Sequence, residues 1–354
     1  MSNMYPSPDD PGYGSFVARQ QHRLADDHGI EFSLVVSSRR GGGYATVLKY
    51  GRLFVETVIA TVRGDYDLVH AHYLLPTAVF ALLPAVLRDR PLLLTVHGTD
   101  IYTAQRPLWK GLVTHALRRA HRVIVVSEFL KGELQAGYDV SPRGGALVSD
   151  MGVDTSRFTP GDRASAKDAA GLPPGIPHVL FVGNLVAAKG VVELASALTA
   201  LAEQGTAFRS TFVGDGPMLA RLHALTSPLG DRVRFTGVLP HDSLVDVFRS
   251  ADVFVLPSHR EGLGLVCLEA LACGVPVLAT RTGGIPEIVQ DGENGMLIEP
   301  GDTSALTAAL SRLLNDEGLR DRLGDTARST ALLHDESFQA GRIASVYKDA
   351  LTGA

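Results

Sequence analysis

The chain alternates short runs of consecutive apolar residues with longer segments in which apolar residues recur every three or four positions. Such short runs are typical of strands buried on both faces of a parallel sheet, and the longer segments of the helices that cover it. The pattern predicts an α/β protein with two doubly wound, Rossmann-like parallel-sheet domains. The predicted strands are FSLVVSS (32–38), DLVHAH (67–72), PLLLTVHG (91–98) and RVIVVS (122–127) in the first half, and HVLFVGN (178–184), RSTFVGDG (209–216), VRFTG (233–237), DVFVLPS (252–258) and PVLAT (276–280) in the second.

A proline- and glycine-rich stretch separates the two halves. Four prolines and three glycines interrupt the strand pattern between residues 156 and 178, as in an interdomain linker. We expect a first domain over 1–160, a linker over 161–177 and a second domain over 178–335. Apolar residues at helical spacing after residue 336 predict a final helix, over 336–354, that packs back on the first domain.

The opening of the chain departs from this pattern. A doubly wound domain normally begins with a strand, whereas residues 2–16, SNMYPSPDDPGYGSF, are typical of the loop that follows one. We expect the first strand to be missing and the first domain to be weakened, because its neighbours would leave backbone groups unpaired in the middle of a sheet.

Charge, cysteine content and hydropathy narrow the functional classes. The 33 basic and 38 acidic residues give a net charge of -5, which argues against a nucleic-acid partner. Cys267 and Cys273 lack the spacing of a zinc site, and two cysteines do not make a disulfide framework, so we expect a reducing, cytoplasmic setting. The longest apolar stretches, such as 79–87, are too short to span a bilayer, and no signal peptide is recognisable.

The segment 257–280, PSHREGLGLVCLEALACGVPVLAT, carries the clearest chemical pattern. Glycines between a predicted strand and a helix start allow a ligand to approach the backbone, and free N–H groups there favour an anion on Gly264, Leu265 and Val266. Glu269 lies about one and a half turns further along, where it could accept hydrogen bonds from a ribose. The alternative is that Glu261 and Glu269 are ordinary acidic residues of a helix start.

A second element favours the ligand site. In GNLVAAKG (183–190), a predicted strand ends in glycine and Lys189 follows at the next helix start, where its ammonium group could neutralise a phosphate.

Taken together, the motifs resemble those of the retaining glycosyltransferases of family 4, which have the two-domain GT-B fold. The resemblance extends over nearly the whole chain, and its order of motifs is similar to that of polysaccharide-assembly enzymes. The matching segments are PGYGSF (11–16), HAH (70–72), HGTD (97–100), VVSE (125–128), MGVDTSRFTP (151–160), GNLVAAKG, FVGDGP (212–217), the Glu261/Glu269 pair, GVPVLAT (274–280) and TGGIPEIV (282–289).

The resemblance implies an acceptor-binding first domain and a second domain that binds a nucleotide diphosphate sugar. It assigns the diphosphate to Lys189, the ribose to Glu269, and the sugar or leaving group to Glu261. His97 would reach the donor sugar from the opposite domain as a catalytic residue. Gly14 and Gly262 are implied donor-binding backbone positions. The donor is a substrate, and neither a cofactor nor a metal is expected.

One position departs from the family pattern. The family commonly places an arginine beside the lysine, and this chain has Asn184 there. We expect Arg260, directly before Glu261, to compensate partly for the lost cation in the donor site.

Two further motifs lie in the first half. Asp65 and Asp67 form a DxD pattern, which chelates a metal in other transferases but is typical here of a solvated turn. His70 and His72 alternate on a predicted strand and therefore point to the same face. We expect His70 to be a core histidine, and His72 and Asp100 to lie at the acceptor or cleft side.

The segment 101–127 is basic and contains no acidic residue. Its apolar stripe, which includes Trp109, Leu112, Val113 and Leu117, could face its own sheet or dock on an anionic membrane surface. The first interpretation is the favoured one. The second would place the protein at the inner face of the membrane, where the acceptor could be lipid-linked.

The sequence therefore favours a retaining enzyme of hexosyltransferase type that moves a sugar from a nucleotide diphosphate sugar, with uridine or guanosine as the base, to a hydroxyl acceptor. Cell-surface polysaccharide, glycolipid and secondary-metabolite synthesis are the expected settings. Two alternatives stay open: a nucleotide-sugar 2-epimerase of the same architecture, and a catalytically weak subunit that only binds the nucleotide sugar.

Overall fold

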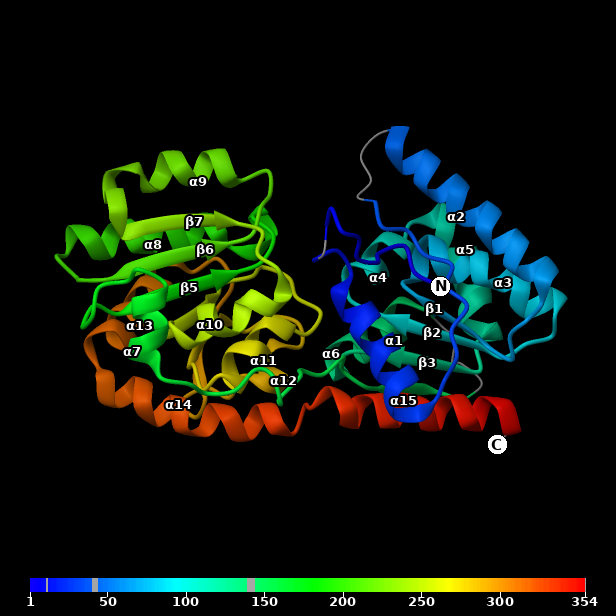
Figure 1. The fold of residues 1–354 in the computed structure, drawn as a ribbon. Helices are drawn as coiled ribbons and strands as arrows, with labels where there is room; N and C mark the ends of the chain where they lie inside the picture. Colours follow the sequence, from blue (N-terminus) through cyan, green and yellow to red (C-terminus); the bar gives the residue numbers. More distant parts are fainter. Residues whose placement is uncertain (11, 40–43, 139–143, 354) are drawn as a thin grey trace. The chain divides into compact units, whose positions relative to one another are not determined.

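The computed structural model of the chain describes residues 1–10, 12–39, 44–138 and 144–353, apart from the side chain of Thr99. The chain forms two compact units, one comprising Met1–Met151 and Glu336–Ala354 and the other Gly152–Asp335 (Figure 1). Each contains a parallel sheet with helices packed on it. The two parallel-sheet α/β domains that the strand pattern predicts are confirmed.

The division falls after Met151, earlier than the boundary expected at residue 160. The backbone after that point is bonded to the second unit. The amide of Val153 donates to the carbonyl of His334 (2.9 Å), and the Arg328 guanidinium donates to the carbonyl of Phe158 (2.6 Å). These bonds explain why the segment just before the prolines belongs to the second unit.

Residues 161–177 contain a helix, α7 (Arg163–Ala169), where a linker was expected. The Asp162 carboxylate caps this helix by accepting from the amide of Ser165 (2.6 Å). Lys167 is buried and forms an ion pair with Asp252 of the same unit (2.5 Å). The prolines and glycines therefore bound a short helix that is fixed to the second unit.

In the first unit the described residues form a parallel sheet in the order β1-β2-β3-β4. Its strands are β1 (Val69–His72), β2 (Leu92–Val96), β3 (Arg122–Val125) and β4 (Ala146–Val148). Its helices are α1 (Ser15–His28), α2 (Tyr44–Arg63), the π-helical turn η1 (Leu74–Ala78), α3 (Val79–Leu87), α4 (Thr99–Ala104), α5 (Pro107–Arg119), α6 (Glu128–Gly137) and α15 (Glu336–Thr352). The sequence analysis did not predict β4, a strand of only three residues.

The final helix packs on the first unit. α15 lies beside α1 (Figure 1), and both contribute to a buried cluster in which Leu24 of α1 and Ile343 of α15 meet Leu93 and Ile124 of the sheet. The start of α15 is held by an ion pair between Glu336 and Arg23 of α1 (2.7 Å). Its apolar residues recur at helical spacing, which is why the sequence predicts the helix and its buried face.

The predicted strand FSLVVSS (32–38) is wrong as a strand. Of its residues only Val36 forms a bridge, in parallel with Ser2, and Ser2 also bridges His72. The amide of Ser2 donates to the carbonyl of Val35 (3.0 Å), and residues 30–34 line a cavity that residues of β1 also line. A run of apolar, β-branched residues does not form a strand by itself, because a strand also needs a neighbouring strand to pair with.

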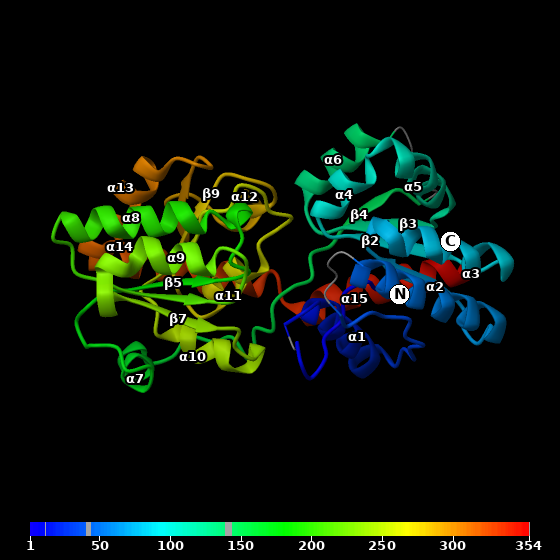
Figure 2. The same ribbon diagram turned by 90° about the horizontal axis from the view of Figure 1, so that it is seen from above.

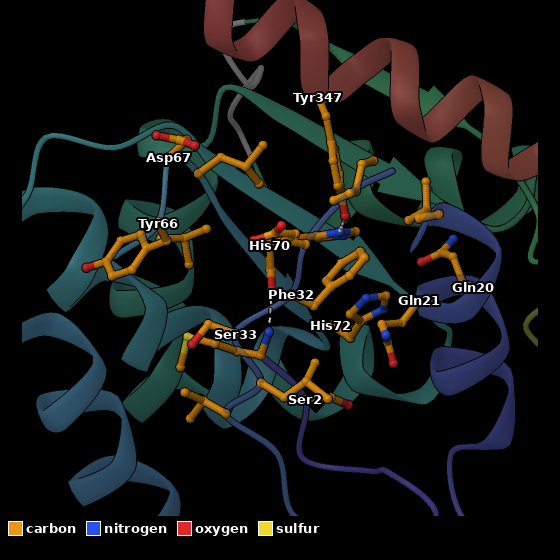
Figure 3. Close-up of a pocket in the computed structure, with 18 of the residues that line it drawn as sticks. Ser2, Gln20, Gln21, Phe32, Ser33, Tyr66, Asp67, His70, His72 and Tyr347 are labelled. Carbon is orange, nitrogen blue, oxygen red and sulfur yellow. Dashed lines mark hydrogen bonds between the residues drawn. The ribbon is translucent and has the colours of Figure 1, made fainter. Parts of the chain in front are cut away.

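His70 occupies the core next to this cavity. Its Nδ1 is hydrogen-bonded to the hydroxyl of Tyr347 (2.6 Å) and its Nε2 to that of Thr95 (2.7 Å) (Figure 3). The prediction of a satisfied core histidine is confirmed. Desolvation by burial lowers the pKa of His70 from 6.5 to about 3, so the ring is neutral at physiological pH.

In the second unit the described residues form a parallel sheet in the order β10-β9-β8-β5-β6-β7. Its strands are β5 (His178–Val182), β6 (Arg209–Val213), β7 (Val233–Gly237), β8 (Val253–Leu256), β9 (Val277–Thr280) and β10 (Gly295–Ile298). Its helices, besides α7, are η2 (Ala187–Lys189), α8 (Val191–Glu203), α9 (Leu219–Thr226), η3 (Ser227–Arg232), η4 (His241–Ser243), α10 (Leu244–Arg249), α11 (Leu265–Ala272), α12 (Ile285–Ile288), α13 (Thr303–Asn315) and α14 (Glu317–Leu332). β10 was not predicted.

The order of the strands reverses direction at β5. The chain moves outward through β6 and β7, returns to pair β8 with the other side of β5, and continues through β9 and β10. α8 lies between α9 and α13, and α11 contacts α14 (Figure 2). The carboxyl ends of β5 and β8 therefore meet at a topological switch point, where ligands of doubly wound sheets commonly bind.

We predict that the first unit loses stability as the pH falls below 6.5. The unfolded chain then binds protons that the folded His70 does not accept until about pH 3, so protonation favours unfolding across this window. The His70→Gln variant should show a shallower decline between pH 7 and pH 5. Urea unfolding followed by fluorescence of the single tryptophan, Trp109 of α5, measures it.

Burial also lowers the pKa of His72 and His97. The loss of stability between pH 7 and pH 5 should therefore be smaller in His70→Gln than in the parent protein, but still present. Equal slopes for the variant and the parent protein would contradict the assignment of a neutral His70.

Candidate functional site

Two loops come together at the carboxyl ends of β5 and β8. After β5 the chain turns through Gly183 into η2, which ends in Lys189, and after β8 it passes through Ser258 to Glu261. The amide of His259 donates to the carbonyl of Ala188 (2.9 Å) and so fixes one loop to the other. This bond places the two loops side by side at the switch point.

Lys189 and Glu261 form an ion pair between Nζ and Oε2, and both side chains are partly buried. The hydroxyl of Ser258 donates to the same Oε2 (3.4 Å), and the amide of Gly262 donates to Oε1 (3.3 Å). The site thus holds a cation and an anion that are largely withdrawn from water. An anionic ligand could take the place of the Glu261 carboxylate beside the ammonium group.

A close backbone contact permits this arrangement. Gly190 lies directly after Lys189 with φ 66°, and a Cβ atom there would overlap the carbonyl oxygen of Pro257. Only glycine combines this left-handed backbone with so close an approach. Lys189 therefore comes within reach of Glu261 because the next residue has no side chain.

The start of α11 lies beside the pair. Gly264 precedes the helix with a left-handed backbone (φ 93°), and Leu265 and Val266 begin it with half-buried side chains. Amides of a first helical turn have no acceptor within the helix, and the dipole adds positive potential there. This end of α11 has the character of an anion-binding position.

Glu269 lies further along α11 and is 5% exposed. Its Oε1 is 2.8 Å from Nε2 of His241, whose ring packs edge-on against Phe158. The sequence analysis missed His241, because a single histidine in the loop after β7 carries no spacing signal. The histidine fixes the orientation of the carboxylate that was predicted to bind a ribose.

The environment of Cys267 shows that the charged groups converge. Burial raises the pKa of this thiol; Glu261 and Glu269 raise it further, and Lys189 lowers it. All three charged side chains thus affect the pKa of this one thiol. The residues predicted from two separate motifs come together in one site of the second unit.

Asn184 and Arg260 are both exposed near this site. Asn184 follows Gly183 directly, and its carbonyl accepts from the amide of Val186 (2.9 Å). Arg260 directly precedes Glu261. The compensating role of Arg260 stays a prediction.

In the first unit, His97 follows β2 and stacks on His72, with 3.1 Å between Nε2 of His97 and Nδ1 of His72. The rings of Phe16 and Tyr73 also pack on His97. Burial holds the pKa of both histidines below the ordinary value, and the effect of neighbouring histidines adds to it at His72. Both rings are therefore neutral at pH 7, suited to hydrogen bonding and not to charge stabilisation.

Asp100 is buried with both carboxylate oxygens engaged. Oδ1 accepts from the amide of Gly98 (2.8 Å) and Oδ2 from that of Leu74 (3.0 Å). Desolvation raises the pKa of Asp100, and these backbone hydrogen bonds lower it. The carboxylate thus fixes the loop that carries His97, and its place at the acceptor or cleft side stays a prediction.

Gly14 caps α1 with φ 70°, and a Cβ atom there would be 2.6 Å from the carbonyl group of Met4. Both the left-handed backbone and the close approach of Met4 therefore favour glycine at this position. Pro11, the first residue of the same motif, lies outside the described residues.

Asp65 and Asp67 are exposed in the loop before β1, as expected of a solvated turn. In the part of the chain that the structure describes, no three His, Cys, Asp or Glu side chains gather as metal ligands would.

The basic segment 101–127 contains the end of α4, α5 and β3. Its apolar stripe is divided. Val113 and Leu117 are buried against the unit, as favoured, whereas Trp109 is 39% and Leu112 46% exposed, so the stripe does not pack on the sheet along its whole length. Among the described helices, none has both the length and the apolar character needed to cross a bilayer.

Comparison with known families covers both units. Residues 14–157 match the family model described as Glycosyltransferase Family 4, and residues 162–330 match that described as Glycosyl transferases group 1. A D-inositol 3-phosphate glycosyltransferase of Acidothermus cellulolyticus is 35% identical over 311 residues, which are 81% of this chain and 68% of that protein. The chain is a family 4 glycosyltransferase.

Other relatives agree with this assignment. N-acetyl-alpha-D-glucosaminyl L-malate synthase of Bacillus anthracis is 31% identical over 291 residues, covering 81% of this chain and 74% of that protein. Sucrose-phosphate synthase from Thermosynechococcus elongatus superposes with a TM-score of 0.77 at 26% identity, covering 92% of this chain and 86% of the other. HepE of Anabaena, in complex with UDP-glucose, has the same fold, with a TM-score of 0.79, 22% identity and 98% of each chain covered.

The contact behind Lys189 gives a prediction for this glycosyltransferase. Gly190→Ala introduces a methyl group that meets the Pro257 carbonyl, whereas Gly205→Ala introduces one at a similar φ (78°) with no atom within 4 Å. The left-handed backbone costs about 1–2 kcal/mol in both variants. The overlap should cost Gly190→Ala about 1–3 kcal/mol more.

Calorimetric unfolding of the two variants measures this difference. Equal melting temperatures for Gly190→Ala and Gly205→Ala would show that the contact between the loops does not constrain the site.

Proposed function

We propose that this glycosyltransferase transfers a sugar from a nucleotide diphosphate sugar to a hydroxyl acceptor and retains the anomeric configuration. The observation that carries the proposal is the convergence of Lys189, Glu261 and Glu269 at the switch point of the second sheet. A cation, a helix start and two carboxylates suit the charge and the hydroxyl groups of such a donor.

In this proposal the diphosphate binds between the Lys189 ammonium group and the first amides of α11. Binding replaces the Lys189–Glu261 ion pair with a Lys189–phosphate pair and releases the Glu261 carboxylate. Glu261 is then available to the hydroxyl groups of the sugar or to the leaving group. Arg260 supplies the second cation, since Asn184 stands where the family commonly has an arginine.

Glu269 accepts hydrogen bonds from the ribose. Its carboxylate is buried on α11, and His241 holds Oε1 at 2.8 Å, so its orientation is set before the ligand arrives. A pre-oriented acceptor loses less conformational entropy on binding than an exposed, mobile side chain does. His241 is thus a positioning residue for the ribose.

Catalysis in this scheme is electrostatic. Lys189 and the α11 amides stabilise the charge that develops on the departing diphosphate, and Glu261 stabilises positive charge on the sugar ring. For His97 we propose a neutral imidazole that hydrogen-bonds to a hydroxyl group, in keeping with its lowered pKa.

The relatives suggest a first set of acceptors. The names of two of them contain L-malate and D-inositol 3-phosphate, which are both small, anionic hydroxyl compounds. We therefore propose small, anionic hydroxyl compounds as candidate acceptors, in addition to the sugar and lipid-linked acceptors of polysaccharide and glycolipid synthesis.

Donor binding tests the roles in the second unit. Lys189→Met and Glu269→Gln should each weaken the binding of the cognate nucleotide diphosphate about tenfold or more, because each removes a charge-assisted hydrogen bond. Isothermal titration with UDP and GDP measures the effect. Lys131→Met, which removes an amino group paired with Glu128 on α6, is the matched control.

Arg260→Ala should weaken the same binding by a smaller factor. Unchanged affinity in Arg260→Ala would remove its compensating role, and unchanged affinity in Lys189→Met would remove the proposed donor site.

The stereochemical outcome is a separate prediction. If the nucleotide is attached to the donor sugar in the axial position, time-resolved NMR should show that the product linkage is also axial. An inverted product would contradict retention. Conversion of the donor into a diastereomer without an acceptor would identify a 2-epimerase, and tight binding without turnover over a broad acceptor panel would identify a binding subunit.

A further inference from the structure

The helix α2 of the first unit carries its large apolar side chains on the side that faces solvent. Eight of them are between 36% and 76% exposed, among them Tyr44, Leu48 and Val62. The residues that it buries are mostly polar, namely Lys49, Leu53, Thr57 and Thr61. A helix on the surface of a monomer normally has the opposite distribution. The outer face of α2 therefore has the composition of a buried face.

Hydrogen bonds fix the inward orientation of the polar residues. The hydroxyl groups of Thr57 and Thr61 each donate to the carbonyl four residues earlier in the helix (2.8 and 2.7 Å). The Lys49 ammonium group donates to the hydroxyl of Tyr13 (2.8 Å), and the guanidinium of Arg88, directly after α3, donates to the carbonyl of Thr61 (2.7 Å). A rotation of α2 that buried its apolar face would break the bonds to Tyr13 and Arg88. The face therefore stays exposed in an isolated copy of the chain.

The apolar surface extends from α2 onto α3, which lies beside it (Figure 1). The rings of Phe54 and Phe80 pack edge to face with 5.3 Å between their centroids, and Val86 and Leu87 of α3 are exposed. The exposed large apolar side chains of the two helices offer an area on the order of 1,000 Å², whereas the largest patch on a typical monomer is about 300–600 Å². Each partner in a standard protein interface buries about 800 Å². The patch is therefore large enough for a stable protein partner.

The spacing of the residues on this face indicates what kind of partner covers it. Intervals of four and three residues alternate through Tyr44, Leu48, Gly51, Val55, Val58 and Val62. These six residues form the α2 seam. Such a heptad spacing keeps one stripe against a single partner helix, with β-branched residues favoured at one of its two core positions. A lipid surface requires an apolar face but no such period.

Residue sizes along the α2 seam are complementary when two copies pair antiparallel. Gly51 then faces Val55 of the other copy, because the two core positions of the heptad alternate across an antiparallel pair. A Cβ atom on Gly51 would have no atom within 4 Å, so the space beside it is open to such a side chain. A parallel pair would set Gly51 against Gly51 and leave a void in the middle of the contact. The α2 seam is thus self-complementary about a two-fold axis.

The charges beside the α2 seam favour a protein partner over an anionic membrane. Arg52 and Glu56 form an ion pair (2.7 Å) and compensate each other. Lys49 points inward to Tyr13, and Arg63 lies at the end of the helix. Helices that bind anionic bilayers carry several Lys or Arg residues along their polar face. The face of α2 has no such basic border.

We propose that two copies of this chain form a symmetric homodimer in which the α2 helices pair antiparallel along the α2 seam. Each copy covers the apolar face of the other with its own, including the adjoining residues of α3. The interface belongs to the first unit and depends neither on the proposed donor site nor on catalysis.

Sedimentation equilibrium of the full chain tests the proposal. The parent protein should be a dimer at micromolar concentration. Val55→Arg places a charge at the centre of the α2 seam and should raise the dissociation constant of the dimer about a hundredfold or more, because the interface would bury two like charges. Leu333→Arg, at an exposed position directly after α14, should leave the constant unchanged. Circular dichroism of both variants checks that the fold is retained.

Cysteine cross-linking tests the antiparallel register. The double variant Leu48→Cys/Val58→Cys should give a covalent dimer under mild oxidation, since the two positions face each other across the α2 seam. Each single variant should not cross-link, because the same position in the two copies would lie about 15 Å apart along the helices. Cys267 and Cys273 are buried, so the parent protein provides the background.

A monomeric parent protein would overturn the proposal, as would a dimer that Val55→Arg leaves intact. Efficient cross-linking of either single variant would contradict the antiparallel pairing. Binding of a monomeric chain to phosphatidylglycerol vesicles that Val55→Arg abolishes would assign the face to a membrane instead.

Discussion

The second unit depends on backbone-to-backbone contact between loops at one edge of its sheet. A side chain at Gly190 would overlap the carbonyl of Pro257, and one at Gly283 would overlap that of Glu261. The same loops are joined by hydrogen bonds, from His259 to Ala188 and from Gly284 to Gly262. These loops follow strands whose register in the sheet is fixed. The glycines let the loops pack closely against one another, and this packing determines where the charged side chains lie. Lys189 and Glu261, far apart in sequence, meet as a result.

The first unit contains a group of neutral histidines, whereas the candidate site of the second unit contains charged side chains. His70, His72 and His97 form a connected series of rings, with 4.4 Å between the first pair of centroids and 5.3 Å between the second. Burial lowers the pKa of all three. A hydrogen-bonding network of neutral groups can hold a loop in place without the desolvation cost of a buried ion pair. His97 belongs to this network, and the buried Asp100 carboxylate separately accepts hydrogen bonds from the backbone of the same loop.

The strand pattern allowed most of the fold to be predicted, and the reasons for the exceptions are physical. Continuous apolar runs such as PLLLTV are recognisable because both faces are buried, whereas β4 and β10 are short and half-buried and lack that signal. FSLVVSS carries the signal and is still no strand, because pairing depends on a neighbour that its own sequence does not specify. In the second unit the glycine–strand–helix motifs led to Lys189 and Glu269, but His241 was not found. Its role arises from tertiary contact with Glu269, which no local spacing encodes.

The Lys189–Glu261 ion pair also bears on how a reaction cycle would finish. A lysine that faced a departing nucleoside diphosphate alone would be left as a partly buried, uncompensated cation, and this penalty would slow dissociation. Glu261 lies close enough to accept the ammonium group as the nucleotide leaves. In the proposed mechanism, the carboxylate would therefore compete with the spent nucleotide for the same cation. The donor would bind less tightly and the product would leave faster, which favours turnover where product release limits the rate.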